Sequence, residues 1–196
     1  APTRQYLLDR MWNPRRVGNV GYVGNQSLNG MWARLLPGRP VAHVLWLASA
    51  AAVLALGIWT ARRVHHRLGE PAGVAVAAVT GLLVSPISWS HHWVWWIVPA
   101  LVLARTAWDR RSWGLLALGV AWTVPFYAGP FWFVPHLRHT DVPHGLGPQL
   151  IASTYVLVAL VALVATAAWV SRPSPISSPG PGARTPAARA VPSHSA

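Results

Sequence analysis

The chain alternates long apolar runs with short polar segments that carry arginine. Val41–Ala61 is apolar except for one histidine and small hydroxyls, and Gln149–Val170 is apolar after a polar start. Trp113–Tyr127 is a shorter apolar run that can extend to Gly129. A transmembrane helix needs about 20 predominantly apolar residues. These runs therefore predict three membrane-spanning helices.

The stretch 72–104 is harder to assign, because it is too long for one span and short for two. Pro86 interrupts it, and the residue before a proline is biased away from helix. The positive-inside rule places arginine clusters beside spans in the cytoplasm, so an even number of crossings must separate two such clusters. The clusters on either side are Arg62, Arg63 and Arg67, then Arg105, Arg110 and Arg111. We therefore predict two short helices here, at about 72–85 and 91–104.

The whole pattern predicts an all-α, polytopic membrane helical bundle with about five transmembrane helices. Residues 1–40 form an extracytoplasmic or interfacial segment, residues 41–170 the transmembrane bundle, and residues 171–196 a disordered cytoplasmic tail rich in Pro, Ser, Ala and Gly. Segments 86–90 and 128–148 then lie outside. Six arginines in residues 1–40 argue for the cytoplasm. We keep this segment outside because the three later arginine clusters agree with one another.

The composition supports a membrane protein. Hydrophobic residues make up 53% and charged residues only 10% of the chain, whereas soluble domains carry about 25% charged residues. The net charge of +12 alone suggests nucleic acid, but the arginines lie between apolar runs, so no nucleic-acid partner is expected. The absence of cysteine excludes disulfides and thiolate sites.

Because Ala1 is not an initiator Met and residues 1–40 lack a signal peptide, we expect the C-terminal part of a longer protein.

Residues 28–36 show helical periodicity, with Leu and other apolar residues at positions i, i+3, i+4, i+7 and i+8. We predict an interfacial amphipathic helix that Asn25 caps and Pro37 ends. Arg34, or Arg15 and Arg16 upstream, is a candidate partner for a phosphate at the helix N-terminus. The alternative is a simple packing helix beneath the membrane surface.

The segment SPISWSHHWVWWIVP, residues 85–99, places polar and aromatic side chains between apolar runs. An interfacial aromatic belt explains its tryptophans, above all Trp95 and Trp96. It explains His91 and His92 less well, since ionisable groups at membrane depth usually face a cavity. Adjacent histidines lack the i, i+4 spacing of a helical metal site, so no metal is expected here. A histidine that binds or protonates an anionic group fits better.

Two motifs together, GNQSLNGMWARL (residues 24–35) and SPISWSHHWVW (residues 85–95), resemble glycosyltransferase family 87 over about residues 1–170. The resemblance implies the GT-C fold, with an extracytoplasmic active-site face in the plasma membrane. It implies inverting transfer of mannose from a polyprenyl-phosphate donor to a glycolipid or lipoglycan acceptor. Membrane lipids are expected as further partners, and no cofactor is expected. Metal dependence is left open. The catalytic base of such enzymes, an Asp in the first extracytoplasmic loop, is expected upstream of Ala1, so the chain alone is expected to be inactive.

The motifs carry the expected substrate-binding residues. These are Asn25, Gln26, Ser27, Asn29, Arg34, Ser88, His91 and His92. The loop 128–148 is expected to be a connector rather than a substrate lid. The rival reading is a transporter or non-catalytic membrane subunit, because broken helices with polar residues at the break also mark transporter sites.

Overall fold

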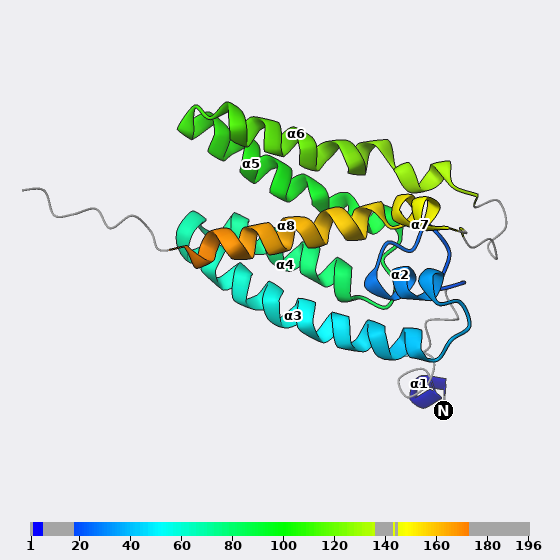
Figure 1. Ribbon diagram of the computed structural model, residues 1–196. Coiled ribbons are helices and arrows are strands. Elements are labelled where there is room, and N and C mark those ends of the chain that lie inside the picture. Colours follow the sequence, from blue (N-terminus) through cyan, green and yellow to red (C-terminus); the bar gives the residue numbers. More distant parts are fainter. Residues whose placement is uncertain (1, 6–17, 136–142, 144, 173–196) are drawn as a thin grey trace, which may run out of the picture.

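The computed structural model describes residues 2–5, 18–135, 143 and 145–172, which are helical apart from turns and one isolated bridge. Figure 1 shows α3, α4, α5, α6 and α8 running along one direction, with the short helices α2 and α7 at one end. The elements in chain order are α1 (Pro2–Gln5), α2 (Leu28–Leu35), α3 (Val41–Leu68), α4 (Glu70–Val84), η3 (Ser90–Trp96), α5 (Ile97–Arg110), α6 (Trp113–Ala128), η4 (Pro130–Phe133), α7 (Leu146–Ala152) and α8 (Thr154–Ser171).

Among the described residues, two helices are long and apolar enough to cross a membrane. These are α3, with 28 residues, and α8, with 18, each with a mean hydropathy of 2.1 in its best window. The apolar helices α4 and α6 have 15 and 16 residues, which at 1.5 Å per residue give about 23 Å, less than a hydrocarbon core of about 30 Å. The described part of the chain is thus a helical bundle with two candidate spans, and five crossings stay a prediction.

The helix ends gather in two groups. The α3–α4 turn, the α5–α6 turn and the C-terminal end of α8 lie at one end of the bundle, and α2 and α7 lie at the other (Figure 1). At the first end, Arg67 donates hydrogen bonds to the carbonyls of Trp169 and Arg172, at 3.3 and 2.6 Å. The arginine clusters of the sequence therefore meet at the same end, as the alternation of spans predicts.

Glycines permit close packing of α3 against α4. A Cβ on Gly57 would overlap the side chain of Thr80, and a Cβ on Gly73 would lie 2.9 Å from that of His65. Such contacts are too short for carbon atoms, so only glycine lets the two backbones approach this closely. The turn between them uses Gly69 at φ +90°.

The predicted elements differ from the structure in three places. The helix from Val41 runs on to Leu68, and the expected helix 91–104 starts as the 3₁₀ helix η3 and continues as α5 to Arg110. The span predicted over 149–170 is shorter in the structure, because the segment splits at Ser153 into α7 and α8, and α8 is the candidate span. This break depends on contacts of Gln26 and Arg34, from α2 and its entry loop, with residues 152–155. Residues 6–17, most of the loop 136–144 and the tail from 173 lie outside the described residues.

Candidate functional site

The two motif segments lie side by side at the α2 end of the bundle. The backbone N–H of Gln26 donates to the carbonyl of Ser88 at 2.8 Å, and that of Ser90 donates to Gly24 at 2.9 Å. Asn25 and Trp89 thereby form an isolated antiparallel bridge. Segments about 60 residues apart in the sequence thus form one unit.

Asn25 fixes this junction with its side chain. Its Oδ1 accepts a hydrogen bond from the Ser88 backbone N–H at 3.0 Å, and its Nδ2 donates to the Val20 carbonyl at 2.9 Å. The prediction that Asn25 caps α2 is therefore wrong, because its amide is already used. Ser27 is the cap, since its Oγ accepts from the Gly30 backbone N–H at 3.1 Å.

Gln26 explains why the last apolar segment breaks. Its Nε2 donates to the carbonyls of Val23 and Ala152, at 2.6 and 2.7 Å, and its Oε1 accepts from the Tyr155 backbone N–H at 3.3 Å. Helix ends leave backbone groups without partners inside the helix. The buried side chain of Gln26 satisfies two of these groups at the junction of α7 and α8, so the break costs little.

Arg34 is almost completely buried, with 1% of its surface exposed. Its Nη1 donates to the carbonyls of Tyr22 and Asn25, at 3.2 and 2.9 Å, and its Nη2 to Ser153 Oγ at 3.2 Å. Burial lowers the pKa of Arg34 to about 9, which keeps it protonated at neutral pH. The guanidinium therefore holds α2, its entry loop and the α7–α8 break together. A direct contact between Arg34 and a phosphate stays a prediction.

Two further site candidates hold the proline of the second motif. The Asn29 Nδ2 donates to the Pro86 carbonyl at 3.1 Å, and the Ser27 hydroxyl approaches the same oxygen at 3.4 Å. Both side chains are buried. The polar residues of the first motif thus form the wall on which the turn 85–90 is built.

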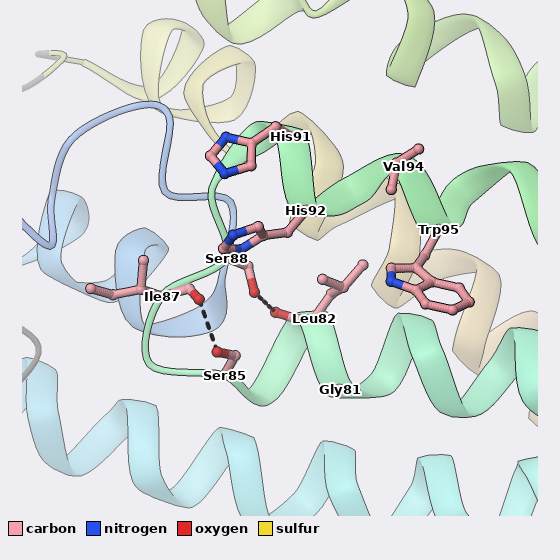
Figure 2. Close-up of a pocket in the computed structure, with 9 residues that line it drawn as sticks. All are labelled: Gly81, Leu82, Ser85, Ile87, Ser88, His91, His92, Val94 and Trp95. Atoms are coloured by element: carbon pink, nitrogen blue, oxygen red, sulfur yellow. Dashed lines mark hydrogen bonds between the residues drawn. The ribbon is translucent and has the colours of Figure 1, made fainter. Parts of the chain in front are cut away.

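A pocket of about 490 Å³ opens on the other side of this turn (Figure 2). Its lining residues come from the end of α4, the turn and η3: Gly81, Leu82, Ser85, Ile87, Ser88, His91, His92, Val94 and Trp95. The turn is held by the Ser88 hydroxyl, which donates to the Leu82 carbonyl at 2.7 Å, and by Ser85, which donates to the Ile87 carbonyl at 2.9 Å. Of the eight predicted site residues, Ser88, His91 and His92 line this pocket.

The two histidines lie together on exposed positions of η3. Their rings meet edge to face, with centroids 4.5 Å apart. A neutral imidazole offers one donor and one acceptor nitrogen. The pair can therefore donate an N–H to an anionic oxygen and accept a hydrogen bond from a hydroxyl.

The tryptophans of the second motif divide between core and surface. Trp93 is fully buried, stacks on Phe126 at 5.5 Å, and donates from Nε1 to the Gln26 carbonyl at 3.0 Å. The aromatic-belt interpretation is therefore wrong for Trp93, which joins the motif to the core. Trp95 is 49% exposed and lines the pocket, so a position at the interface fits it.

The sequence did not indicate several residues that complete this region. The Ser153 hydroxyl accepts from Arg34, the Tyr155 backbone N–H donates to Gln26, and Gly81 and Leu82 form one wall of the pocket. The pair of hydroxyl residues at 153–154 inside an apolar run was a visible signal for the break. In the described residues, no three His, Asp or Glu side chains form a group that could hold a metal.

Fold and site together define a helical membrane-type protein with a polar, histidine-lined pocket at one end of its bundle. Residues 1–86 match the family model of glycosyltransferase family 87. The chain is 37% identical over 161 residues to a polyprenol-phosphate-mannose-dependent alpha-(1-2)-phosphatidylinositol mannoside mannosyltransferase of Mycobacterium tuberculosis, covering 82% of this chain and 37% of the relative. It is 36% identical over 172 residues to the enzyme of the same description from Mycolicibacterium smegmatis, covering 82% and 38%.

A third relative, a polyprenol-phosphate-mannose-dependent alpha-(1-2)-phosphatidylinositol pentamannoside mannosyltransferase of Mycobacterium tuberculosis, is 33% identical over 170 residues, which cover 86% of this chain and 38% of the relative. These matches place the chain in glycosyltransferase family 87. The chain spans a little over a third of the length of the curated relatives that it matches. No solved structure matches it.

Proposed function

We propose that the chain is the C-terminal part of an integral-membrane mannosyltransferase. The complete enzyme moves mannose from a polyprenyl-phosphate donor to a glycolipid or lipoglycan acceptor, with inversion at the anomeric carbon. The relatives use a polyprenol-phosphate-mannose donor and a phosphatidylinositol mannoside, by their descriptions. The observation that carries the proposal is the direct hydrogen bonding of the two family-like motifs around one pocket.

The pocket supports this chemistry through its histidines. The acceptor hydroxyl attacks the anomeric carbon while the lipid phosphate leaves, so the enzyme must take up a proton and stabilise an anion. His91 and His92 contact the donor phosphate or the acceptor hydroxyl in our proposal. The general base itself is expected on the segment that precedes Ala1, so the chain alone transfers no mannose.

The buried polar residues hold the segments around the pocket in place without lining it. Asn25, Gln26, Ser27, Asn29 and Arg34 bond to backbone groups of the turn, of α2 and of the α7–α8 break. We propose that they act as positioning residues, because each hydrogen-bonds to another part of the protein and none lines the pocket. Holding catalytic groups within a fraction of an ångström is worth large factors in rate.

The pocket end of the bundle faces the outside of the plasma membrane in this proposal. Its support is the gathering of arginine-bearing helix ends at the opposite end, which the positive-inside rule assigns to the cytoplasm. In this topology α3, α4, α5 with η3, α6 and α8 make the five crossings.

The test is mannosyl transfer by the complete gene product. Membranes that contain it receive radiolabelled polyprenyl-phosphate-mannose and phosphatidylinositol mannoside, and labelled product is separated by thin-layer chromatography. We expect donor-dependent transfer by the complete product and none by residues 1–196 alone. Transfer by the short chain refutes its dependence on an upstream base. Solute uptake that persists without the lipid-linked sugar favours the transporter instead.

A further inference from the structure

A second, apolar groove lies in the other half of the bundle and shares no residue with the histidine pocket. Its volume is about 410 Å³, and α4, α5, α6, α8 and the C-terminal end of α3 form its walls. It begins among Val64, Arg110 and Trp169 at the arginine-bearing end and reaches Val79, Trp122 and Ala159 in the middle of the bundle. The proposed mannose transfer at the histidine pocket does not involve this groove.

The length and lining of the groove suit a hydrocarbon chain. The wall formed by α8 runs from Ala159 to Trp169, which is ten residue steps or about 15 Å at 1.5 Å per residue. The residues along this length are mostly apolar. An acyl chain can therefore lie along the groove.

The mouth of the groove carries a free positive charge. Arg105 pairs with Asp109 at 2.9 Å, and Arg67 donates to carbonyls at the end of α8. The guanidinium of Arg110, which lines the mouth, has no hydrogen bond or ion pair to any residue that the structure describes. It is also the last residue of α5, where the helix dipole favours a cation that can attract an anion from outside. The acidic residues at this end of the bundle are Glu70 and Asp109, and Asp109 already pairs with Arg105.

We propose that the groove binds one acyl chain of an anionic phospholipid, whose phosphate lies against Arg110. The apolar walls take the chain and the free guanidinium takes the headgroup, an arrangement that suits arginine. The lipid enters at the end opposite the histidine pocket, so it occupies the other leaflet from the sugar donor. The site is structural or regulatory and does not depend on mannosyl transfer.

The test uses the complete gene product in phosphatidylcholine vesicles that contain a minor fraction of a probe lipid with a photoreactive acyl chain. One probe is phosphatidylglycerol and the other is phosphatidylcholine with the same chains. After illumination, labelled peptides are mapped by mass spectrometry. We expect label on the groove-lining segments of α4 and α8, and about fivefold more with the anionic probe, which corresponds to about 1 kcal/mol for one arginine near an anionic headgroup.

Three variants separate the parts of the proposal. Ala162→Trp fills the groove and should abolish the labelling, whereas Val161→Trp, on the neighbouring position with 71% exposure, should leave it unchanged. Arg110→Gln lies on the surface and should remove the preference for the anionic probe while the chain still enters. If Ala162→Trp fails to fold, the Arg110→Gln result decides alone.

Other occupants give different results. Stronger labelling of the groove by a photoreactive polyprenyl phosphate than by the phospholipid overturns the proposal, because the groove then serves the donor. Crosslinks from groove residues to another protein segment overturn it too, because a helix then covers the groove. Equal labelling by both phospholipid probes, unaffected by Arg110→Gln, contradicts the role of the headgroup.

Discussion

Asn25→Ala tests whether the first motif positions the second. The substitution removes the acceptor for the Ser88 backbone N–H and the donor to the Val20 carbonyl. Asn25 is fully buried, so water does not replace these bonds without a cavity. A buried polar group left without a partner costs about 1–3 kcal/mol. With two groups orphaned, we expect a loss of about 2–4 kcal/mol in the free energy of unfolding.

Asn29→Ala is the matched control for this change. It removes a single hydrogen bond, from Nδ2 to the Pro86 carbonyl at 3.1 Å, and that carbonyl keeps the Ser27 hydroxyl within 3.4 Å. The expected loss is about 1 kcal/mol, the net value of an ordinary hydrogen bond. The two variants therefore differ by at least about 1 kcal/mol in the free energy of unfolding, although each replaces a buried asparagine with alanine.

The assay is thermal unfolding of the complete gene product in detergent, followed by tryptophan fluorescence, together with mannosyl transfer at a temperature where both variants stay folded. Asn25→Ala should melt below Asn29→Ala and lose more activity, mainly in kcat, since the turn that carries the histidines loosens. Equal melting temperatures, with wild-type activity for Asn25→Ala, would refute the reasoning that this amide holds the turn in place.

Two further substitutions test the same wall. Gly30→Ala should unfold or strongly destabilise the protein, because a Cβ there would overlap the backbone carbonyl of Asn25, whereas Gly147→Ala, with no atom within 4 Å, should be neutral in thermal melts. Arg34→Met removes the buried cation. Since burial lowers the pKa of Arg34 to about 9, well below its value in the unfolded chain, the unfolded chain binds more protons above pH 9. The free energy of unfolding of the wild type should therefore rise with pH from about 9 relative to the Met variant. Parallel pH profiles for the two proteins would show that Arg34 is not desolvated.

The elements that local periodicity controls were predicted well. The sequence predicted α6 at 113–127 and the structure has Trp113–Ala128, and it predicted α2 at 28–36 where the structure has Leu28–Leu35. Both helices begin after a serine whose hydroxyl accepts a backbone hydrogen bond, a local signal that the sequence shows. Helical spacing and end signals act within a few residues, so the sequence alone contains them.

The errors arose from contacts between distant residues. The break at Ser153 depends on Gln26, 126 residues before Ala152, to which it donates a hydrogen bond. Trp93 is buried because Phe126 stacks on it and the Gln26 carbonyl accepts its N–H. No local pattern contains these pairings. The sequence also showed that residues 25–29 are polar, but it did not show that their polar atoms bond to the protein itself.

The most direct measurement compares two histidine pairs in the same protein. His91→Ala/His92→Ala removes the pair in the pocket. His65→Ala/His66→Ala removes another exposed pair at the other end of the bundle, whose ring centroids lie 5.4 Å apart. Mannosyl transfer is measured in membranes with equal amounts of each complete gene product. Our account predicts a loss of at least about 100-fold for the first variant, the scale of one lost acid–base group, and near wild-type transfer for the second. Wild-type transfer by the His91→Ala/His92→Ala protein would contradict the assignment of the pocket as the site of mannose transfer.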